Sequence, residues 1–501
     1  MAQLERPHPP GAYPVVVVGS GPGGLQVSYA LSRLGVRHAL LSQDDGPGGM
    51  FRRLPVLGRL VSWTKPFAPA THDDRRYERF DLNSLVGDEP AHRAIASEML
   101  DSDTHFPTRD QMARAFATFA ERAGIRVRYG CRWESTRRNA DGFTVVTPDG
   151  EYRCRVVVFA IGMARPWKPA IAGLDDVPHY AEFDRPREYS DRSVFIVGKR
   201  NSAFELADGL LPFARRIILG SPSPALFSVL TRSVVGARAR YLQPYEDHVL
   251  AGGNFVIDVA IERVEKCSNG GFRVHATETV TTTRHVYTVD DVIAATGFEV
   301  PMQDLRSLGV ATVMQDRLPA QTPFWESVSV PGIYFAGTVT QGATELMKHG
   351  VPSTSGAVQG FRYNARILAR HIAEAHFGTR ATRPQIAPGR IVEHLLAQAT
   401  ESPELWAQRA YHASVVELDP ARGILDQGIV PLAHFIDASA PDAIAVAVEP
   451  DASGAIHPVV YTRSGHTVRE TLLPSTQTND FRTAEHRAEL EHLLEAIRPH
   501  V

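Results

Sequence analysis

The chain has 501 residues, 43% of them hydrophobic and 22% charged, with a formal net charge of −3 at pH 7. This length supports a large core and roughly three domains. A charge so close to zero gives no reason to expect nucleic acid or an anionic membrane as a partner, and no apolar run approaches the roughly 20 residues that cross a bilayer.

The cysteines and the start of the chain indicate a cytoplasmic protein. Cys131, Cys154 and Cys267 lie far apart and form no CxxC pair, which argues against a dithiol redox centre and against a zinc site. Residues 1–11 lack an apolar segment of signal-peptide length, so we expect a loose arm there. The stretch THDD has one histidine and two adjacent aspartates without ligand spacing, and we predict no metal site.

Short apolar runs that end at a glycine predict the strands of an α/β fold. Continuous apolar strands are typical of parallel sheets that helices cover on both faces. Strands that end at glycine before a helix present ligand sites at the carboxyl edge of such sheets. The runs are PVVVVGSG, RCRVVVFAIG, RSVFIVGKR, VDDVIAATG and GIYFAG.

The first run leads into Gly19-x-Gly21-x-x-Gly24, with a further glycine at Gly23. An amphipathic helical pattern follows and ends near Gly35, and the strand HALLS comes at the right distance to complete a βαβ unit. The glycines allow a tight turn and the close approach of a pyrophosphate, which the free N–H groups of the helix would hold. We predict a dinucleotide here; a glycine-rich turn in an unrelated α/β protein is the alternative.

The residues after the second strand concern the ribose of that dinucleotide. An acid usually binds the ribose hydroxyls at this position, and Ser42 occupies it in this sequence. Ser42, Gln43 or Asp44 could bind the ribose, and the sequence does not decide between them.

A second strand–glycine–helix–strand unit begins at SVFIVGKRNSAFELADGLLPFARRIILGS, with the spacing Gly198-x-Arg200-x-x-Ala203. Arg200 stands where the middle glycine is expected, and it could clamp a pyrophosphate or block its approach. A degenerate unit kept for structure is the alternative. The residues that we assign to a second nucleotide site are Gly198, Lys199, Arg200, Asn201 and Ser202.

Two such units, together with DDVIAATGF and PGIYFAG, resemble the flavoproteins with two dinucleotide-binding domains. Within them the chain is similar to the class B flavin-dependent monooxygenases, which include flavin-containing, N-hydroxylating and Baeyer–Villiger enzymes. The similarity covers about residues 12–380. It implies that the first unit binds FAD and that the inserted second unit binds NADPH, with NADH as an alternative.

Local motifs carry the resemblance further. DDGPGGMFRR contains Gly49 and Met50, HFPTRDQ contains Arg109, and GLDDVPHYAEF keeps a histidine and an aromatic residue at His179 and Phe183. His179 would either position the nicotinamide domain or bond linker backbone. The FAD residues that the resemblance implies are Gly19, Gly21, Gly23, Gly24, Ser42, Gln43, Gly49, Met50, Arg109, Gly162, Thr296, Gly297, Gly337, Thr338 and Ser355.

An amphipathic pattern from Val358 to Gly378 predicts a helix whose N-terminus faces the flavin, with Ser353, Thr354 or Ser355 as its cap. The helix dipole would stabilise the negative charge of the reduced flavin. The family chemistry then proceeds through dioxygen and a flavin hydroperoxide, from which water must be excluded. The catalytic candidates near the flavin are Trp63, Lys65, Lys348 and His349; core packing of the tryptophan and solvation of the lysine are the alternatives.

The predicted organisation is an α/β fold of two Rossmann-like dinucleotide-binding domains followed by a small α+β extension. IVEHLLAQA and PELWAQRAYHA predict helices in the extension, DAIAVAVEPDASGAIHPVVYTRSG predicts two strands, and RTAEHRAELEHLLEAIRP predicts a final helix. The expected segments are an arm (1–11), the FAD domain (12–165 and 286–383), the NAD(P)H domain (166–285) and the extension (384–501).

The leading functional hypothesis is an FAD-dependent, NAD(P)H-linked monooxygenase that inserts one oxygen atom into a small molecule, by amine N-hydroxylation or by Baeyer–Villiger chemistry. A flavin oxidase or reductase without an oxygenated product is the second hypothesis. A flavoprotein with a degenerate nicotinamide site and a binding role is the third. The extension could cap the substrate pocket, form a homodimer contact or stabilise the fold, and the sequence does not choose.

Overall fold

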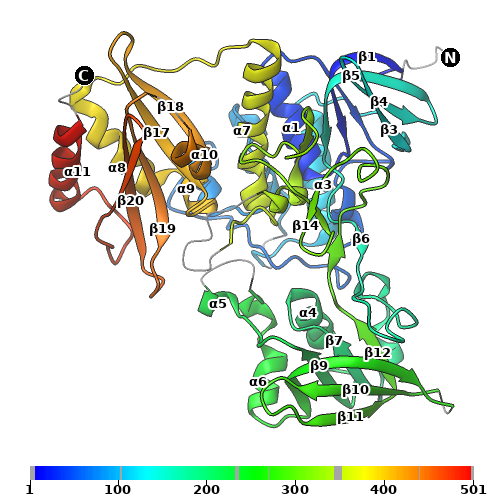
Figure 1. Ribbon diagram of the computed structural model, residues 1–501. Helices are drawn as coiled ribbons and strands as arrows, with labels where there is room; N and C mark the ends of the chain where they lie inside the picture. Colours follow the sequence, from blue (N-terminus) through cyan, green and yellow to red (C-terminus); the bar gives the residue numbers. More distant parts are fainter. Residues whose placement is uncertain are drawn as a thin grey trace.

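The computed structural model describes residues 6–101, 104–231, 236–268, 270–343, 352–438 and 441–497. The chain forms three lobes (Figure 1), and the predicted mixed α/β fold with two Rossmann-like sheets is confirmed. The first and second lobes are joined by two chain crossings, whereas the third lobe follows the long helix α7 and lies against its far side.

The first lobe is built on a sheet of order β2-β1-β5-β4-β3, with β16 paired to β5. β1, β2, β5 and β16 run parallel, and β3, β4 and β5 form an antiparallel meander. Its strands are β1 Gly11–Val18, β2 His38–Leu41, β3 Ser135–Asn139, β4 Gly142–Thr147, β5 Gly150–Phe159 and β16 Ile333–Phe335, with a small ribbon of β14 Thr312–Val313 and β15 Leu318–Pro319. Its helices are α1 Pro22–Arg33, α2 Ile95–Glu98, α3 Arg109–Arg122 and α7 Val358–Phe377.

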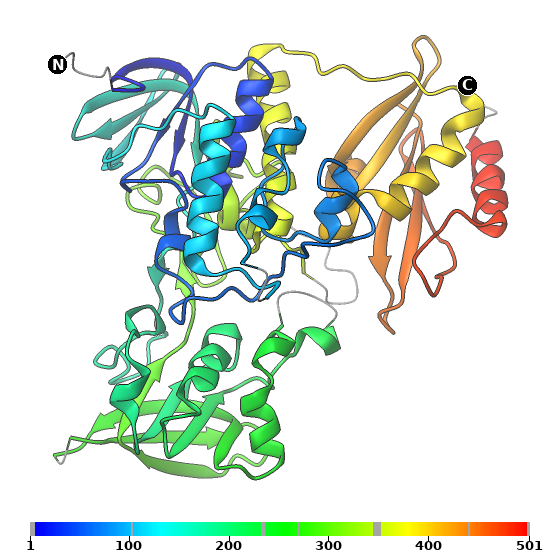
Figure 2. The same ribbon diagram turned by 180° about the vertical axis from the view of Figure 1, so that it is seen from behind.

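The valines of β1 show why this sheet is central. Val15 and Val17 pack into the core beneath α1 and α7, while Val16 and Val18 pack into a second core on the opposite face. All four are at most 5% exposed, and each contributes roughly 1.5–3 kcal/mol through burial. Figure 2 shows α1, α3 and α7 side by side over one face of the sheet.

The second lobe contains a sheet of order β11-β10-β9-β8-β7-β12, parallel from β12 to β9 and antiparallel beyond it. Two short strands, β6 Arg165–Pro166 and β13 Phe298–Glu299, pair antiparallel where the chain enters and leaves this lobe. Its strands are β7 Ser193–Val197, β8 Arg216–Ser221, β9 Asn254–Lys266, β10 Phe272–Glu278, β11 Arg284–Val289 and β12 Asp291–Ala294; its helices are α4 Asn201–Leu210, α5 Ser228–Thr231 and α6 Gln243–Val249.

The C-terminal extension is an antiparallel sheet of order β18-β17-β19-β20-β21, flanked by helices. The predicted pair of strands and the predicted final helix are confirmed, whereas the helix expected over PELWAQRAYHA ends at Ala407 and the chain enters a strand at His412. The elements are α8 Ile391–Glu401, α9 Pro403–Ala407, β17 His412–Asp419, β18 Gly423–Pro431, α10 Leu432–Asp437, β19 Ala443–Pro450, β20 Ile456–Ser464, β21 Thr467–Leu472 and α11 Ala484–Ile497.

The extension docks on the first lobe through polar contacts. Arg75 bonds Glu404 at 2.5 Å, and Arg370 of α7 donates to the carbonyl oxygen of Ile429 at 2.7 Å. The indole N–H of Trp325 meets the hydroxyl of Tyr411 at 3.2 Å. The backbone N–H of Thr354, just before α7, donates to the side chain of Gln408, just after α9, at 2.9 Å, so α9 lies beside the start of α7.

Candidate functional site: a dinucleotide cradle and a cavity between three lobes

Packing within the protein explains three of the four glycines after β1. A Cβ on Gly24 would lie 1.8 Å from the carbonyl oxygen of Gly19, and a Cβ on Gly23 would lie 2.4 Å from the Cα of Gly337. Gly19 has a φ of 107°, and its Cβ would lie 2.4 Å from the carbonyl oxygen of Ala160. A side chain on Gly19 would push β1 from the end of β5, one on Gly24 would push α1 from the end of β1, and one on Gly23 would push α1 from the segment after β16.

Gly21 has a different environment. A Cβ there would meet no atom of the described residues within 4 Å, and its φ of −66° is accessible to any residue. Gly21 is the N-cap of α1 and provides no side-chain cap, so the first N–H groups of the helix remain free to bind an anion. Open space above a helix N-terminus fits the pyrophosphate of a dinucleotide.

Gly21 faces a cavity of about 310 Å³ at the carboxyl edge of the first sheet. Sequence reasoning missed several residues of its wall, among them Arg53, Arg132, Trp133, Gln303 and Phe361, because loops bring them together from distant parts of the chain. The residues that were predicted and that line this cavity are Gly19, Gly21, Gly23, Ser42, Gln43, Gly49, Met50, Gly162, Gly337 and Thr338.

The loop after β2 distinguishes between the ribose candidates. Ser42 is 2% exposed, and its hydroxyl accepts hydrogen bonds from the hydroxyl of Ser20 at 2.8 Å and from the backbone N–H of Asp44 at 3.2 Å. Asp44 lines the cavity, and its carboxylate lies 3.7 Å from the guanidinium of Arg53. Ser42 therefore shapes the turn, and Asp44 presents the carboxylate that usually meets a ribose.

Three loops meet at the opposite wall of the cavity. Thr338 accepts a hydrogen bond from the backbone N–H of Met163 at 3.1 Å. Gly162 has a φ of 66°, and a Cβ there would lie 3.7 Å from the sulfur of Met50 and 3.8 Å from the hydroxyl of Thr338. The ends of β5 and β16 and the segment 47–50 therefore meet around the 310 Å³ cavity.

The start of α7 differs from the prediction. Its N-cap is Ala357, which makes no side-chain cap, so the expected cap from Ser353, Thr354 or Ser355 is wrong. Ser355 is completely buried and does not line the 310 Å³ cavity. Its hydroxyl accepts hydrogen bonds from the side chain of Asn364 at 2.9 Å and from that of Gln408 at 3.1 Å. The hydroxyl of Ser353 donates to that of Ser355 at 2.9 Å, and the hydroxyl of Thr354 donates to the side-chain oxygen of Gln408 at 3.0 Å. The three hydroxyls are thus engaged with other partners than the N–H groups of α7.

Gly198 and Lys199 of the second unit serve the protein itself. Gly198 has a φ of 141°, and a Cβ there would lie 2.5 Å from the carbonyl oxygen of Ala295 on the neighbouring strand. Lys199 is buried and forms an ion pair with Asp258 of β9, so its charge is already paired within the protein.

Arg200 and Asn201 begin α4. Arg200 is its exposed N-cap, and its charge adds to burial in lowering the pKa of Arg317, so the two cations share one region. Asn201 accepts from the backbone N–H of Arg238 at 3.0 Å and donates to the carbonyl oxygen of Gly236 at 3.2 Å. Ser202, half-buried, is the second residue of the helix.

The chain crossings between the lobes hold several other predicted residues. His179 is fully buried, bonds the carbonyl oxygen of Gly297 at 3.0 Å and accepts from the backbone N–H of Ala181 at 3.1 Å. Thr296 donates to the carbonyl oxygen of Trp167 at 2.5 Å. These groups bond linker backbone, so the structure places them at the joint between the lobes and not in a cavity wall.

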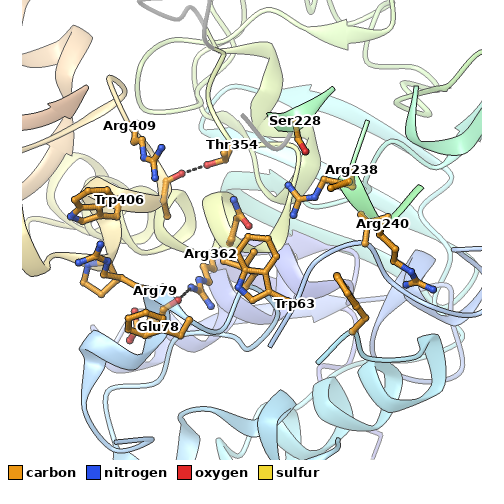
Figure 3. A pocket seen from close by; sticks show the side chains of 18 of the residues that line it. Trp63, Glu78, Arg79, Ser228, Arg238, Arg240, Thr354, Arg362, Trp406 and Arg409 are labelled. Carbon is orange, nitrogen blue, oxygen red and sulfur yellow. Dashed lines mark hydrogen bonds between the residues drawn. The ribbon is translucent and has the colours of Figure 1, made fainter. Parts of the chain in front are cut away.

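A larger cavity of about 590 Å³ lies where the three lobes meet (Figure 3). Trp63 lines it, with the guanidinium of Arg238 5.4 Å from the centre of its ring. Lys65 is exposed and lies outside the walls of both cavities. Phe361 of α7 lines the smaller cavity while Gln359 and Arg362 line the larger one, so the first turn of α7 separates the two spaces.

The remaining predicted residues lie elsewhere. Arg109 begins α3 and donates to the carbonyl oxygen of Arg53 at 3.1 Å, at the edge of the smaller cavity. Lys348 and His349 lie outside the described residues. Over the part of the chain that is described, no group of three or more histidine, cysteine, aspartate or glutamate residues could hold a metal ion, and no helix has both the length and the hydrophobicity for a membrane crossing.

These features define the flavoprotein fold with two dinucleotide-binding domains. The family model described as pyridine nucleotide-disulphide oxidoreductase matches residues 16–337. The chain belongs to this family, which confirms the resemblance to two-domain flavoproteins drawn from its motifs.

Individual relatives support the same fold. The chain is 26% identical over 440 residues to FAD-dependent oxidoreductase domain-containing protein 2 of Danio rerio, a match that covers 77% of this chain and only 62% of the relative. A flavin-containing monooxygenase from Stenotrophomonas maltophilia superposes with a TM-score of 0.54 at 19% identity, over 73% of this chain and 99% of the other. A bacillithiol disulfide reductase from Bacillus cereus gives 0.54 at 20% identity, over 73% and 100%.

Proposed function

We propose that the protein is an FAD-dependent, NAD(P)H-linked monooxygenase that inserts one oxygen atom from dioxygen into a small-molecule substrate. Amine N-hydroxylation and Baeyer–Villiger insertion are the two reaction types. The observation that carries the proposal is Gly21, which has open space at a helix N-terminus and faces the 310 Å³ cavity. When bound there, FAD would accept a hydride and react with dioxygen, chemistry that the cofactor supplies.

The chain's own residues would bind and orient the cofactor. The free N–H groups at the start of α1 would hold its pyrophosphate, and the Asp44 carboxylate would bind a ribose hydroxyl. The uncapped N-terminus of α7 provides a positive dipole end beside Phe361, and this dipole would stabilise negative charge on the flavin ring. Aromatic walls at Trp133 and Phe361 would limit the access of water.

The nicotinamide nucleotide would bind at the start of α4. Arg200 and Arg317 carry positive charge there, and guanidinium groups are well suited to phosphate. These guanidinium groups would bind either the 2′-phosphate of NADPH or the pyrophosphate that NADPH and NADH share.

A flavin oxidase or reductase is the second candidate because Arg200 replaces the expected glycine and could keep the nucleotide at a distance. Disulfide reduction through a cysteine pair of this chain is disfavoured. All of its cysteines are free, and both Cys131 and Cys154 are buried.

Absorption spectra test the proposal directly. The purified protein should show the bands of bound flavin, and anaerobic NADPH should bleach them. With oxygen and the correct amine or ketone, NADPH consumption should match the formation of a product heavier by one oxygen atom. Turnover that yields only hydrogen peroxide would favour the oxidase, and bound flavin that neither nicotinamide nucleotide reduces would favour a binding role.

A further inference from the structure

The larger cavity is built by all three lobes, including the C-terminal extension. Its wall residues lie within segments 61–82, 228–229, 238–240, 352–362 and 403–409, together with Phe106 and Asn479. Trp63, Leu82 and Phe106 supply apolar surface from the first lobe, and Trp406 supplies it from the extension. A cavity of about 590 Å³ with apolar walls and a few charged groups is typical of a small-molecule site.

Positive charge dominates this cavity. Its wall contains the arginines 79, 238, 240, 362 and 409, and Glu78 is the one acidic residue that lines it among the residues that the structure describes. The carboxylate of Glu78 is already engaged, because it accepts from the guanidinium of Arg75 at 3.1 Å and from the hydroxyl of Tyr363 at 2.8 Å. It therefore does not neutralise the arginines that face the cavity.

Two of the arginines donate to backbone oxygens, although the Nε of Arg362 has no acceptor among the described residues. Arg362 donates to the carbonyl oxygens of Ser84 at 2.6 Å and Glu78 at 2.8 Å. Arg240 donates to the carbonyl oxygen of Leu60 at 2.6 Å. These bonds hold both side chains in the wall. The other arginines of the wall are Arg79, Arg238 and Arg409.

Arg79 and Arg409 lie against the same indole ring of the extension. Their guanidinium carbons are 4.1 Å and 5.1 Å from the ring centre of Trp406. Arg79 also donates to the carbonyl oxygen of Thr400 at 2.6 Å, whereas the Nε of Arg409 is buried without an acceptor among the described residues. Figure 3 shows this pair on one side of the cavity, with Arg238 and Arg240 on the other.

Neither Arg409 nor Arg238 has a carboxylate partner within the described residues. Burial and the charge of Arg79 lower the pKa of Arg409 to about 10, and burial alone lowers the pKa of Arg238, which is 6% exposed. Desolvated positive charge without a counter-charge is costly. A bound anion would remove that cost, and one guanidinium offers the planar pair of donors that fits one carboxylate.

We propose that the larger cavity binds the substrate and that this substrate is an organic carboxylate, whose anionic group is bound by Arg409 of the extension. This inference rests on the proposed function and adds the substrate class and a role for the extension. The apolar walls around Trp63 and Phe106 would hold the body of the acid while Arg409 binds its charge.

The test is isothermal titration calorimetry on the FAD-loaded full chain with three probes: 3-phenylpropionate, its neutral amide 3-phenylpropionamide, and 2-phenylethyl phosphate. The acid should bind about tenfold more tightly than the amide, as expected for a charged hydrogen bond. Arg409→Gln should weaken the acid about tenfold and leave the amide unchanged. Arg409→Lys should retain part of the preference, and Arg469→Gln, an exposed arginine of the same extension, should change nothing.

Equal binding of acid and amide, or an equal loss of both in Arg409→Gln, would overturn the inference. Tighter binding of the phosphate than of the acid would overturn the choice of a carboxylate. A comparable loss of NADP⁺ affinity in Arg409→Gln would assign the arginine to the nicotinamide nucleotide and overturn it as well. Flavin content and anaerobic reduction by NADPH, measured on the same preparations, report on the proposed function separately.

Discussion

In the turn after β1, one glycine has a different environment from the other three. The motif contains four glycines that look alike in the sequence, yet a Cβ on Gly19, Gly23 or Gly24 would meet protein atoms, while a Cβ on Gly21 would meet none of the described residues within 4 Å. The spacing of the motif predicts the turn and its strand and helix. It does not reveal which glycine is bare for the sake of a ligand, because that depends on β5 and on the segment after β16.

Gly21→Val should abolish FAD binding without unfolding the protein. The isopropyl group would enter the space that we assign to the pyrophosphate, while the φ of −66° accepts valine. The measurement is flavin content after purification, together with the melting temperature of the apoprotein. Gly389→Val is the matched control, because its Cβ would also meet nothing within 4 Å and its φ is not positive. A fully flavinated Gly21→Val protein would count against the cradle.

Asp44→Ala should weaken FAD binding by about tenfold, since it removes a charged acceptor for the ribose. The dissociation constant comes from titrating apoprotein with FAD. Asp45→Ala is the control, because its neighbouring carboxylate is 85% exposed and pairs with Arg52 at the surface. If the two variants bind FAD with equal affinity, the ribose contact would have to be assigned to Ser42 or Gln43.

At the scale of elements, a buried polar network joins the start of α7 to the extension. The amide nitrogen of Gln408 donates to Asn364 at 2.7 Å and to Ser355 at 3.1 Å, and its oxygen accepts from the backbone N–H of Thr354 at 2.9 Å. Gln408, Asn364 and Ser355 are fully buried. The extension therefore positions the helix that we expect to face the flavin.

Gln408→Leu should reduce the free energy of unfolding by roughly 2–4 kcal/mol, because it leaves several buried polar groups without partners. We also expect flavin release at a lower temperature, since the segment before α7 loses its anchor. Denaturant unfolding and flavin fluorescence on heating measure the two effects. Gln477→Leu, an exposed glutamine of the same extension, should leave both unchanged; a similar response from the two variants would contradict the role of the network.

The strand β17 shows why parts of the extension escaped prediction. Ala413 and Val415 pack into one core and Val416 and Leu418 into another, so both faces of the strand are buried. The segment HASVVELD consequently lacks the alternation of polar and apolar residues that identifies a half-exposed strand. For α7, by contrast, the sequence does carry the periodic pattern of its element. Its one-sided apolar pattern and its terminal Gly378 predicted its end correctly.

At the scale of the whole molecule, a buried carboxyl group ties the second lobe to the first. Glu205 of α4 accepts from the hydroxyl of Tyr180 at 2.5 Å and from the backbone N–H of Leu57 at 3.2 Å. It is 4% exposed, and burial raises its pKa to about 7. Close contact is possible because Gly209 lacks a Cβ, which would lie 2.2 Å from a methyl carbon of Leu57.

Glu205 should make the protein less stable as the pH rises from about 4.5 to about 7. In this window the unfolded chain has released the proton while the folded protein keeps it, so the folded state binds more protons and loses stability with rising pH. The loss should approach about 3 kcal/mol. Glu205→Gln should remove this pH-dependent loss. The melting temperature of the variant minus that of the wild type should therefore be higher at pH 8 than at pH 5. The exposed Glu188→Gln should show no such trend.

The sequence by itself determined the two strand–glycine–helix units and the helix that ends at Gly378, because these depend on local periodicity and on the conformational freedom of glycine. The glycine spacing together with the family resemblance supplied ten of the residues that line the smaller cavity. Only the tertiary structure decided that a Cβ on Gly21 would meet open space, that Ser42 is bonded within the turn while the Asp44 carboxylate lines the cavity beside Arg53, and that Lys65 lies at the surface. It also decided the larger cavity, whose arginines come from positions as distant as 79, 238 and 409. Charges so far apart in the chain meet only when three lobes pack together, and no local pattern records that packing.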